Sequence, residues 1–315
     1  MTQAAIQITD LCFSYGRKNV LGGVNLSVPA GSVFGFLGRN GSGKTTTIKL
    51  LLGLLKPSAG SCTVQKLDPA VDPMAVRRSV GYMAEDQQMY GWMRVGEIIK
   101  WVAGFYPGWD NKLVGELTDL LDLSPRTKVK ALSKGQNSRL ALLLALGHRP
   151  DVVILDDPTL GLDPIARKDF LRHVITLLQS NNVTVFFSSH LLYEIEPVAD
   201  QVAILDHGVI IKTGKTDQLR ESVRRFVFAP KPDATLNRLE GLLDVTHAAD
   251  SVAVTIEDCD DAKRTAIHEA STNSIQETAL NLDEIFEAYV IGNRGTVEKR
   301  LALTGDRARE ASAND

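Results

Sequence analysis

The chain has 315 residues, of which 44% are hydrophobic and 23% charged, and its formal net charge is −3. This composition is that of a folded water-soluble protein of one or two domains, without the basic surface typical of nucleic-acid binding. No apolar run reaches the roughly 18 residues of a membrane helix, and the N-terminus lacks the features of a signal peptide. We therefore expect a cytoplasmic protein, with its three scattered cysteines reduced.

The first 32 residues carry two strand patterns around a turn. Residues 6–13 alternate loosely and residues 24–28 form a second strand, which Pro29-Ala30-Gly31 closes. Tyr15 lies in the turn between them, where an aromatic ring just before a nucleotide site could stack on a base. A lone aromatic residue is more often a packing residue, so Tyr15 alone decides nothing.

Residues 38–46 read GRNGSGKTT and fit the phosphate-loop pattern G-x-x-x-x-G-K-[ST]. A buried strand pattern precedes them and a helical pattern follows, which is the context that the motif requires. Glycines let the backbone approach a phosphate, and the loop N–H groups then point at the anion. We expect a nucleoside triphosphate to be bound by Gly38, Asn40, Gly41, Ser42, Gly43, Lys44, Thr45 and Thr46. Lys44 should reach the β- and γ-phosphates, and the Thr45 hydroxyl should ligate Mg²⁺.

Residues 87–150 read as a helical insertion into an α/β domain. A weak strand over 61–67 and an apolar pattern from 76 that leads into a strand and a polar loop by residue 88 precede it. Residues 95–105 and 111–123 each have one apolar face, and Asp110 is placed to cap the second helix. In the first helix this face includes Phe105. The stretch 132–136, LSKGQ, opens a further helix that Ser133 could cap. A helix N-terminus can bind an anion, and a plain capped helix is the alternative.

Residues 152–156 form a buried apolar strand that ends in the carboxylate of Asp156, and a second carboxylate, Asp157, follows it directly. Asp156 is placed to bind Mg²⁺ through water, and Asp157 to polarise an attacking water. A solvated strand end is the alternative. Asp163 caps the next helix, which Pro164 begins. The following strand leads to His190, at a strand end suited to contact a γ-phosphate, and residues 201–213 form a hairpin.

The order of these motifs resembles the ATP-binding subunit of an ABC transporter over about residues 4–220. The matches are Tyr15 to the adenine-stacking aromatic, 38–45 to Walker A, Glu85 to the Q-loop glutamine, 132–136 to the LSGGQ signature, 152–156 to Walker B, 162–163 to the D-loop and His190 to the switch histidine. The resemblance implies an α/β ABC-type P-loop ATPase fold, with a parallel core sheet, an antiparallel β subdomain and a helical subdomain.

The resemblance also implies a mechanism that uses two ATPase subunits, with a homodimer as the simpler expectation. Two ATP molecules, each with Mg²⁺, lie between the subunits. One chain supplies Walker A and the other Ser133, Gly135, Gln136 and Asp163. Asp157, His190 and Glu85 are the implied catalytic residues, and Thr45, Asp156 and Glu85 the implied metal ligands. The helical subdomain and Q-loop receive a coupling helix of a separate membrane permease, which holds the chain at the inner face of the membrane.

Three residues depart from the family pattern. Asp157 replaces a glutamate and is shorter by about 1.5 Å, and a misplacement of about 1 Å can cost roughly 10²-fold in rate. We therefore expect slow hydrolysis. Glu85 in place of glutamine resembles exporter-type subunits. Lys134 replaces the first signature glycine and either adds a cation near the partner's phosphates or is simply solvated.

The remaining chain reads as a small α+β accessory domain over residues 221–292, followed by a flexible tail over 293–315. Strand patterns occupy 226–228, 252–256 and 274–278, and helical patterns 236–243, 262–270 and 282–290. A ferredoxin-like arrangement fits this order. The domain resembles the extension of drug- and lipid-exporter-type subunits, in which a Leu-x-x-x-Phe helix is common; here the pair is Leu282 and Phe286.

The sequence thus favours an ATP-hydrolysing subunit that powers transport, with export preferred, through a separate permease. One alternative is a soluble ABC ATPase that does not transport. The absence of a coiled-coil insertion, a tandem cassette and a basic patch argues against it. A second alternative is a regulator that binds ATP and hydrolyses it slowly, which the shortened Asp157 suggests.

Overall fold

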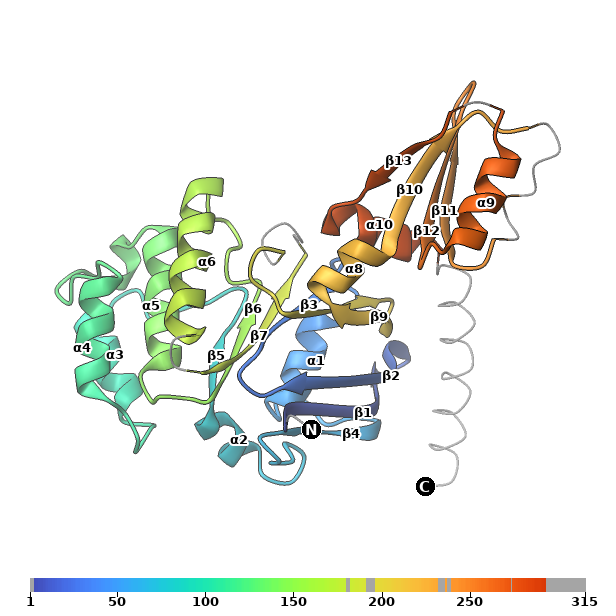
Figure 1. The fold of residues 1–315 in the computed structure, drawn as a ribbon. Coiled ribbons are helices and arrows are strands. Elements are labelled where there is room, and N and C mark those ends of the chain that lie inside the picture. The colour runs from blue at the N-terminus through green and yellow to red at the C-terminus, as the bar shows by residue number, and fades with distance from the viewer. Residues whose placement is uncertain are drawn as a thin grey trace.

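The computed structural model describes residues 3–179, 182–190, 196–231, 236, 239–272 and 274–292. Within them, three sheets and the helices around them form a central α/β part, a helical part beside it and a C-terminal α+β unit (Figure 1). The expected tail over 293–315 lies outside the described residues.

The central sheet has six strands in the order β5-β6-β7-β3-β8-β9. The first five run parallel, and β9 returns antiparallel to β8, as the predicted hairpin requires. The buried apolar runs predicted at 33–37 and 152–156 are both inner strands. The carboxyl ends of parallel strands meet at one edge, so the phosphate loop and Asp157 come together there. The strands are β3 (Val33–Gly38), β5 (Val80–Met83), β6 (Val152–Asp156), β7 (Thr184–Ser189), β8 (Gln201–Asp206) and β9 (Val209–Lys215).

A second, antiparallel sheet consists of β2 (Lys18–Pro29), β1 (Ala4–Tyr15) and β4 (Ala59–Val64), in that order. It packs against α1 (Lys44–Leu51), the helix that follows the phosphate loop. Ile6 and Ile8 of β1 share one buried apolar cluster with Ile48 of α1 and Phe34 of β3. The hairpin that carries Tyr15 is therefore attached to the nucleotide end of the central sheet.

The helical part contains α3 (Val95–Ala103), α4 (Asn111–Leu120), the short 3₁₀ helix η1 (Val129–Ala131) and α5 (Lys134–Leu146). Asp110 caps α4 as predicted, since its Oδ1 accepts from the backbone N–H of Lys112 at 2.9 Å and of Leu113 at 3.0 Å. The prediction for Phe105 was wrong. Helix α3 ends at Ala103, and Phe105 is 57% exposed instead of facing the core.

Two further helices frame the central sheet. Helix α2 (Pro73–Ser79) precedes β5, so the strand begins at Val80, later than the apolar pattern suggested. Helix α6 (Pro164–Gln179) begins at the predicted proline, and Asp163 Oδ1 accepts from the backbone N–H groups of Ile165 and Ala166, each at 3.0 Å. The predicted capping role of Asp163 is therefore confirmed.

The C-terminal unit is an antiparallel sheet in the order β11-β12-β10-β13. This order, with α9 between β12 and β13, agrees with the second half of a ferredoxin-like β-α-β-β-α-β unit. The helix expected over 236–243 was partly wrong, because Leu242 already belongs to β11. Residues 232–235 and 237–238, where the first helix would lie, are outside the described residues. The elements are α8 (Thr216–Ser222), β10 (Val223–Phe228), β11 (Leu242–His247), β12 (Val252–Glu257), α9 (Asp261–Ala270), β13 (Gln276–Ala279) and α10 (Leu282–Gly292).

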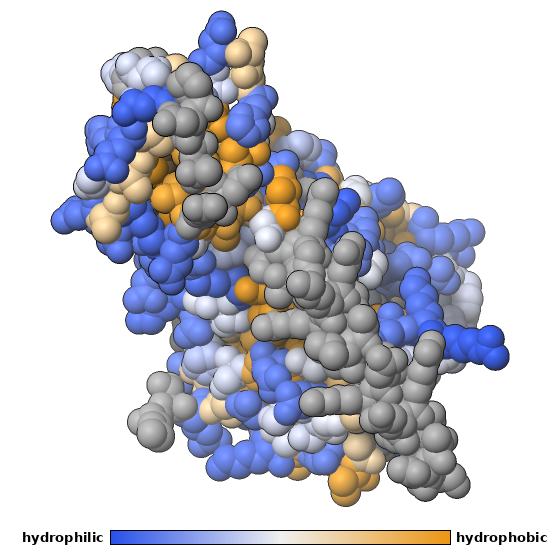
Figure 2. Space-filling model, turned by 90° about the vertical axis from the view of Figure 1, so that its right-hand side faces the viewer, coloured by the Kyte–Doolittle hydropathy of each residue, from blue (hydrophilic) through white to orange (hydrophobic). Residues whose placement is uncertain are grey.

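The two faces of this sheet are covered differently. Helix α9 packs on one face through Ile267, which joins Phe226 and Val254 in a separate apolar cluster. On the other face α10 buries Ile285 and Tyr289 in the cluster that also contains the central sheet. Apolar side chains also gather at the surface in the upper part of the molecule, where this unit lies (Figure 2). The unit is thus packed against the ATPase part.

Candidate nucleotide site

The phosphate loop has the backbone that an anion cradle needs. Gly41 and Gly43 have φ of +81° and +113°, in the left-handed region that favours glycine. Gly38 approaches the neighbouring strand so closely that a Cβ there would lie 2.5 Å from the backbone oxygen of Leu205. The backbone N–H of Ser42 donates to the Arg39 carbonyl at 3.1 Å, which closes the loop before α1. Among the described residues the buried Ser42 hydroxyl has no hydrogen-bond partner.

Lys44 is the buried cation at the centre of the site. Its Nζ donates to the Gly38 carbonyl at 2.8 Å and lies 3.8 Å from Oδ2 of Asp157. Burial lowers the pKa of Lys44, while the carboxylates of Asp157, Asp156 and Glu85 act in the opposite direction. These three acids therefore lie within electrostatic range of the phosphate-loop lysine, as expected for one site.

Asp156 is completely buried at the end of β6. The Ser188 hydroxyl donates to its Oδ1 at 2.5 Å, whereas Oδ2 has no hydrogen-bond partner in the described part of the chain. Burial raises the pKa of Asp156, and the hydroxyls of Ser188 and Thr45 oppose that rise. A buried, unpaired carboxylate oxygen beside a threonine hydroxyl is a donor set that fits Mg²⁺. The role of Ser188 was missed, although its position at a strand end next to His190 was a usable signal.

Asp157 is held on one side by His190. Its Oδ1 accepts from the backbone N–H of His190 at 3.2 Å and lies 2.8 Å from the His190 Nδ1. The φ of Asp157 is +42°, a conformation that aspartate tolerates better than most residues. Its backbone N–H donates to the carbonyl and to the hydroxyl of Ser188, each at 3.1 Å. Asp157 and His190, which the sequence predicted separately, thus form a hydrogen-bonded unit beside Lys44.

Glu85 and Tyr15 lie at the margins of this site. Glu85 follows β5, and partial burial raises its pKa, with the Asp157 and Asp156 carboxylates adding to the effect. Tyr15 is 48% exposed and meets the Phe13 ring edge-on at 4.8 Å. Its hairpin touches the phosphate loop through Leu21, whose Cδ2 is 2.6 Å from where a Cβ on Gly43 would be.

The signature residues form a second group. Ser133 and Gln136 make a capping box at the start of α5, with bonds of 3.2 Å and 3.0 Å. Gly135 faces Leu162 of the D-loop, beside Asp163. Within the described residues no hydrogen bond or ion pair joins this group to Lys44 or Asp156. One chain therefore carries two separate halves of the predicted site.

An exposed aromatic cluster, missed in the sequence, lies on the helical part. Its rings form a chain of contacts. Between ring centroids, Tyr90 is 6.0 Å from Trp92 and 5.3 Å from Trp101, and Trp101 is 4.9 Å from Phe105. Their exposed fractions are 50%, 71%, 46% and 57% in the order Tyr90, Trp92, Trp101 and Phe105. Contiguous exposed aromatic side chains mark interaction surfaces more often than isolated ones do.

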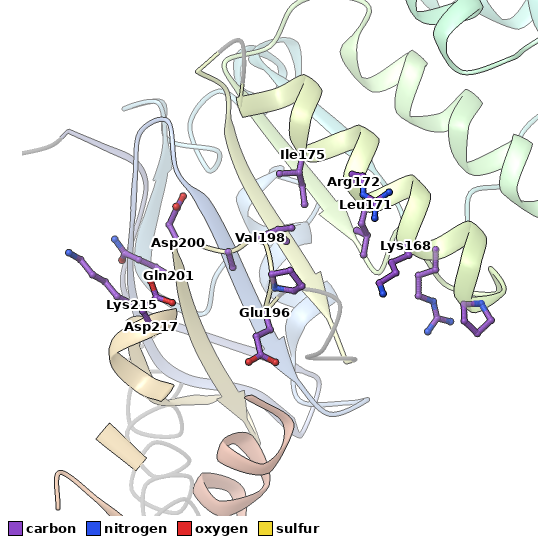
Figure 3. Close-up of a pocket in the computed structure, with 14 residues that line it drawn as sticks. Lys168, Leu171, Arg172, Ile175, Glu196, Val198, Asp200, Gln201, Lys215 and Asp217 are labelled. Carbon is purple, nitrogen blue, oxygen red and sulfur yellow. The ribbon is translucent and has the colours of Figure 1, made fainter. Parts of the chain in front are cut away.

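A pocket of about 980 Å³ lies elsewhere, between α6 and the segment that leads into β8. Lys168 and Arg172 of α6 lie on one side, and Glu196 and Asp200 on the other (Figure 3). None of the predicted site residues lines it.

Comparisons with known proteins identify the family of this chain. A family model described as "ABC transporter" matches residues 21–160, which contain the phosphate loop, the signature and Asp157. The bacitracin transport ATP-binding protein BcrA of Bacillus licheniformis is 35% identical over 224 residues, which cover 70% of this chain and 73% of BcrA. This chain belongs to the family of ABC transporter ATP-binding proteins.

Two further matches extend the family assignment. The ABC transporter ATP-binding protein YtrB of Bacillus subtilis is 26% identical and aligns over 92% of this chain and 99% of its own length. A solved structure described as the ATP-binding subunit of an ABC transporter has a TM-score of 0.64 at 27% identity, and the match covers 69% of this chain and 92% of that one. The fold is thus that of an ABC ATPase.

As a member of this family, the chain binds ATP and hydrolyses it, and the hydrolysis of ATP is coupled to transport. Subunits of this family work with membrane permease components. In the described part of the chain, no helix is both long enough and apolar enough to span a bilayer.

Proposed function

We propose that this chain drives export through a separate permease, as a dimer that closes on two ATP molecules and opens after hydrolysis. The observation that carries the proposal is the division of site residues in one chain. Lys44, Asp156 and Asp157 meet at the sheet edge, while Ser133 lies in a different group with the D-loop. A second copy would supply the missing half to each nucleotide.

In each nucleotide site, the Lys44 ammonium would leave the Gly38 carbonyl and Asp157 and bind the phosphates of ATP. The ammonium is buried, and its nearest carboxylate oxygen is 3.8 Å away. The Thr45 hydroxyl and Oδ2 of Asp156 would hold Mg²⁺, and Glu85, whose pKa responds to the Asp156 and Asp157 carboxylates, is the candidate third ligand. Bound Mg²⁺ neutralises charge on the phosphates. The exposed ring of Tyr15 is available to stack on the adenine.

Asp157 and His190 would act together on the attacking water. Because Oδ1 of Asp157 is bonded to His190, it holds the imidazole through Nδ1 and leaves Nε2 for the γ-phosphate. The second oxygen, Oδ2, remains near Lys44 and is the candidate base. The short side chain and its bond to His190 favour slow hydrolysis. They also support the alternative of an ATP-gated regulator, which measured turnover with and without the permease would separate.

The exposed aromatic cluster of Tyr90, Trp92, Trp101 and Phe105 is the proposed docking surface for the coupling segment of the permease. In the sequence the cluster begins just after the loop that holds Glu85, so a segment bound there is close along the chain to a residue of the nucleotide site. Docking would hold the chain at the inner face of the membrane. The similarity to BcrA, a bacitracin transport protein, supports a transport role, and the C-terminal unit, which resembles the extension of exporter-type subunits, favours export.

The test is an affinity pull-down from detergent-solubilised native membranes with the tagged Asp157→Asn chain, in which hydrolysis is slowed so that ATP holds the dimer closed. Mass spectrometry should recover a permease at near-equal stoichiometry and, by size, two copies of this chain. Recovery of soluble partners alone would contradict transport and favour a non-transport ATPase. A Lys44→Ala chain, which cannot hold the phosphates, is the matched control.

A further inference from the structure

The D-loop pair 162–163, taken together with the residues before it as 158–163, belongs to a short series of turns between β6 and α6. The backbone N–H of Leu160 donates to the Asp157 carbonyl, and that of Leu162 to the Thr159 carbonyl, each at 3.1 Å. Gly161 between them has a φ of +77° and carries no side chain to hold the segment. Local turn bonds of this kind open readily unless something packs on them.

The side chain of Lys134 lies across this glycine. If Gly161 had a Cβ, it would be 3.2 Å from the Nζ of Lys134, 3.4 Å from its Cδ and 3.8 Å from its Cε. One residue further, a Cβ on Gly135 would lie 3.7 Å from Cδ2 of Leu162. The first turn of the signature helix therefore lies beside the D-loop of the same chain at two consecutive residues of each, with room between them for no more than one added carbon.

Charge does not explain this position of Lys134. Among the described residues, no carboxylate lies within ion-pair distance of its ammonium. A cation in the first turn also opposes the helix dipole. The methylene stem, by contrast, gains from covering the bare backbone at Gly161 while the ammonium stays at the surface. Glycine, which the family signature usually has at this position, offers no such cover.

We infer that Lys134 is a positioning residue that holds the D-loop against the signature helix of its own chain. The effect of this contact on ATP hydrolysis rests on the proposed dimer. The D-loop also carries Leu160, 48% exposed, and is followed by Ile165, 76% exposed, which a second copy would bury. Lys134 joins the signature helix to the D-loop. The signature residues and the D-loop, which would both face the second copy, therefore keep a fixed orientation relative to each other before ATP binds.

Hydrogen–deuterium exchange of the nucleotide-free chain tests the contact directly. In Lys134→Gly, peptides spanning residues 157–163 should exchange about threefold to tenfold faster than in wild type, because local opening becomes easier. Lys134→Met keeps the stem without the charge and should stay within about twofold of wild type. Lys112→Gly is the matched control: an exposed lysine in the first turn of α4, remote from the D-loop, whose loss should leave these peptides unchanged.

Steady-state ATP hydrolysis supplies a second measurement. Lys134→Gly should lower kcat about threefold while KM for ATP stays the same, since the phosphate loop is untouched, and Lys134→Met should restore kcat. Equal exchange in wild type and Lys134→Gly would overturn the inference, as would equal acceleration in the glycine and methionine variants. A wild-type chain without ATPase activity would contradict the proposed function, and the exchange data would still decide the role of Lys134.

Discussion

Oδ1 of Asp157 lies 2.8 Å from Nδ1 of His190 and also accepts the His190 backbone N–H. The carboxylate thus fixes both the ring and the chain of the histidine. A glutamate at the same backbone position has one more methylene, so its carboxylate would lie further from the backbone and could leave His190. The two residues predicted separately from two strand ends therefore act as one hydrogen-bonded unit.

Replacing Asp157 by asparagine should lower kcat by about 10²-fold or more, because the amide cannot accept a proton from water. Binding of ATP should persist, since Lys44 and the phosphate loop are intact. Single-turnover hydrolysis together with nucleotide binding by fluorescence measures both. Asp157→Glu, which keeps the carboxylate, is the control and should retain activity. Wild-type turnover in Asp157→Asn would show that Asp157 is not the base.

Replacing Ser188 by alanine should weaken the metal site more than the phosphate loop. The change removes the 2.5 Å bond to Asp156 and leaves a fully buried carboxylate with fewer partners. We expect a loss of stability of about 1–3 kcal/mol and a higher Mg²⁺ requirement for hydrolysis. Urea unfolding and a Mg²⁺ titration check this. Ser79→Ala, at the end of α2, removes a local serine bond away from the site and should change only stability.

The ring of His148 stacks on Tyr106 at 4.1 Å, and burial lowers the pKa of its imidazole. As pH falls below about 6.5, the unfolded chain takes up a proton there before the folded chain does. This histidine therefore contributes stability above that pH and loses it as pH falls toward the folded-state pKa. Unfolding free energies at pH 7.5 and 5.5 should differ less in His148→Gln than in wild type.

The matched control for this pH effect is His247→Gln, at the exposed end of β11. It should leave the difference between the two pH values as it is in wild type. An unchanged pH dependence in His148→Gln would contradict the assignment of the proton to His148.

Replacing Trp101 by alanine should separate the permease surface from the ATPase chemistry. Trp101 contacts both Tyr90 and Phe105, so its loss divides the aromatic cluster. Recovery of the permease in the pull-down should fall about tenfold or more, while ATP hydrolysis by the isolated chain stays unchanged. Leu54→Ala, which removes another exposed apolar side chain, should not affect recovery. Full recovery with Trp101→Ala would contradict docking at this cluster.

Sequence alone determined the features that neighbouring residues decide. The phosphate loop, the strand ending in Asp156 and the capping residues Asp110, Ser133 and Asp163 all depend on hydrogen bonds and burial within a few positions. Such local rules also placed Asp156, Asp157 and His190 at strand ends, and parallel strands bring these ends together. The roles proposed for these residues in catalysis remain predictions.

Tertiary structure decided what depends on contacts between distant segments. Ser188 reaches Asp156 from 32 positions away because β7 pairs with β6 in the central sheet. The side chain of Lys134 lies beside Gly161, on the far side of β6 in the sequence, for a reason that no local pattern contains. The periodicity of apolar residues predicts which face of a helix or strand is buried. Which residues of other elements that face contacts depends on the order of the strands and the packing of the helices.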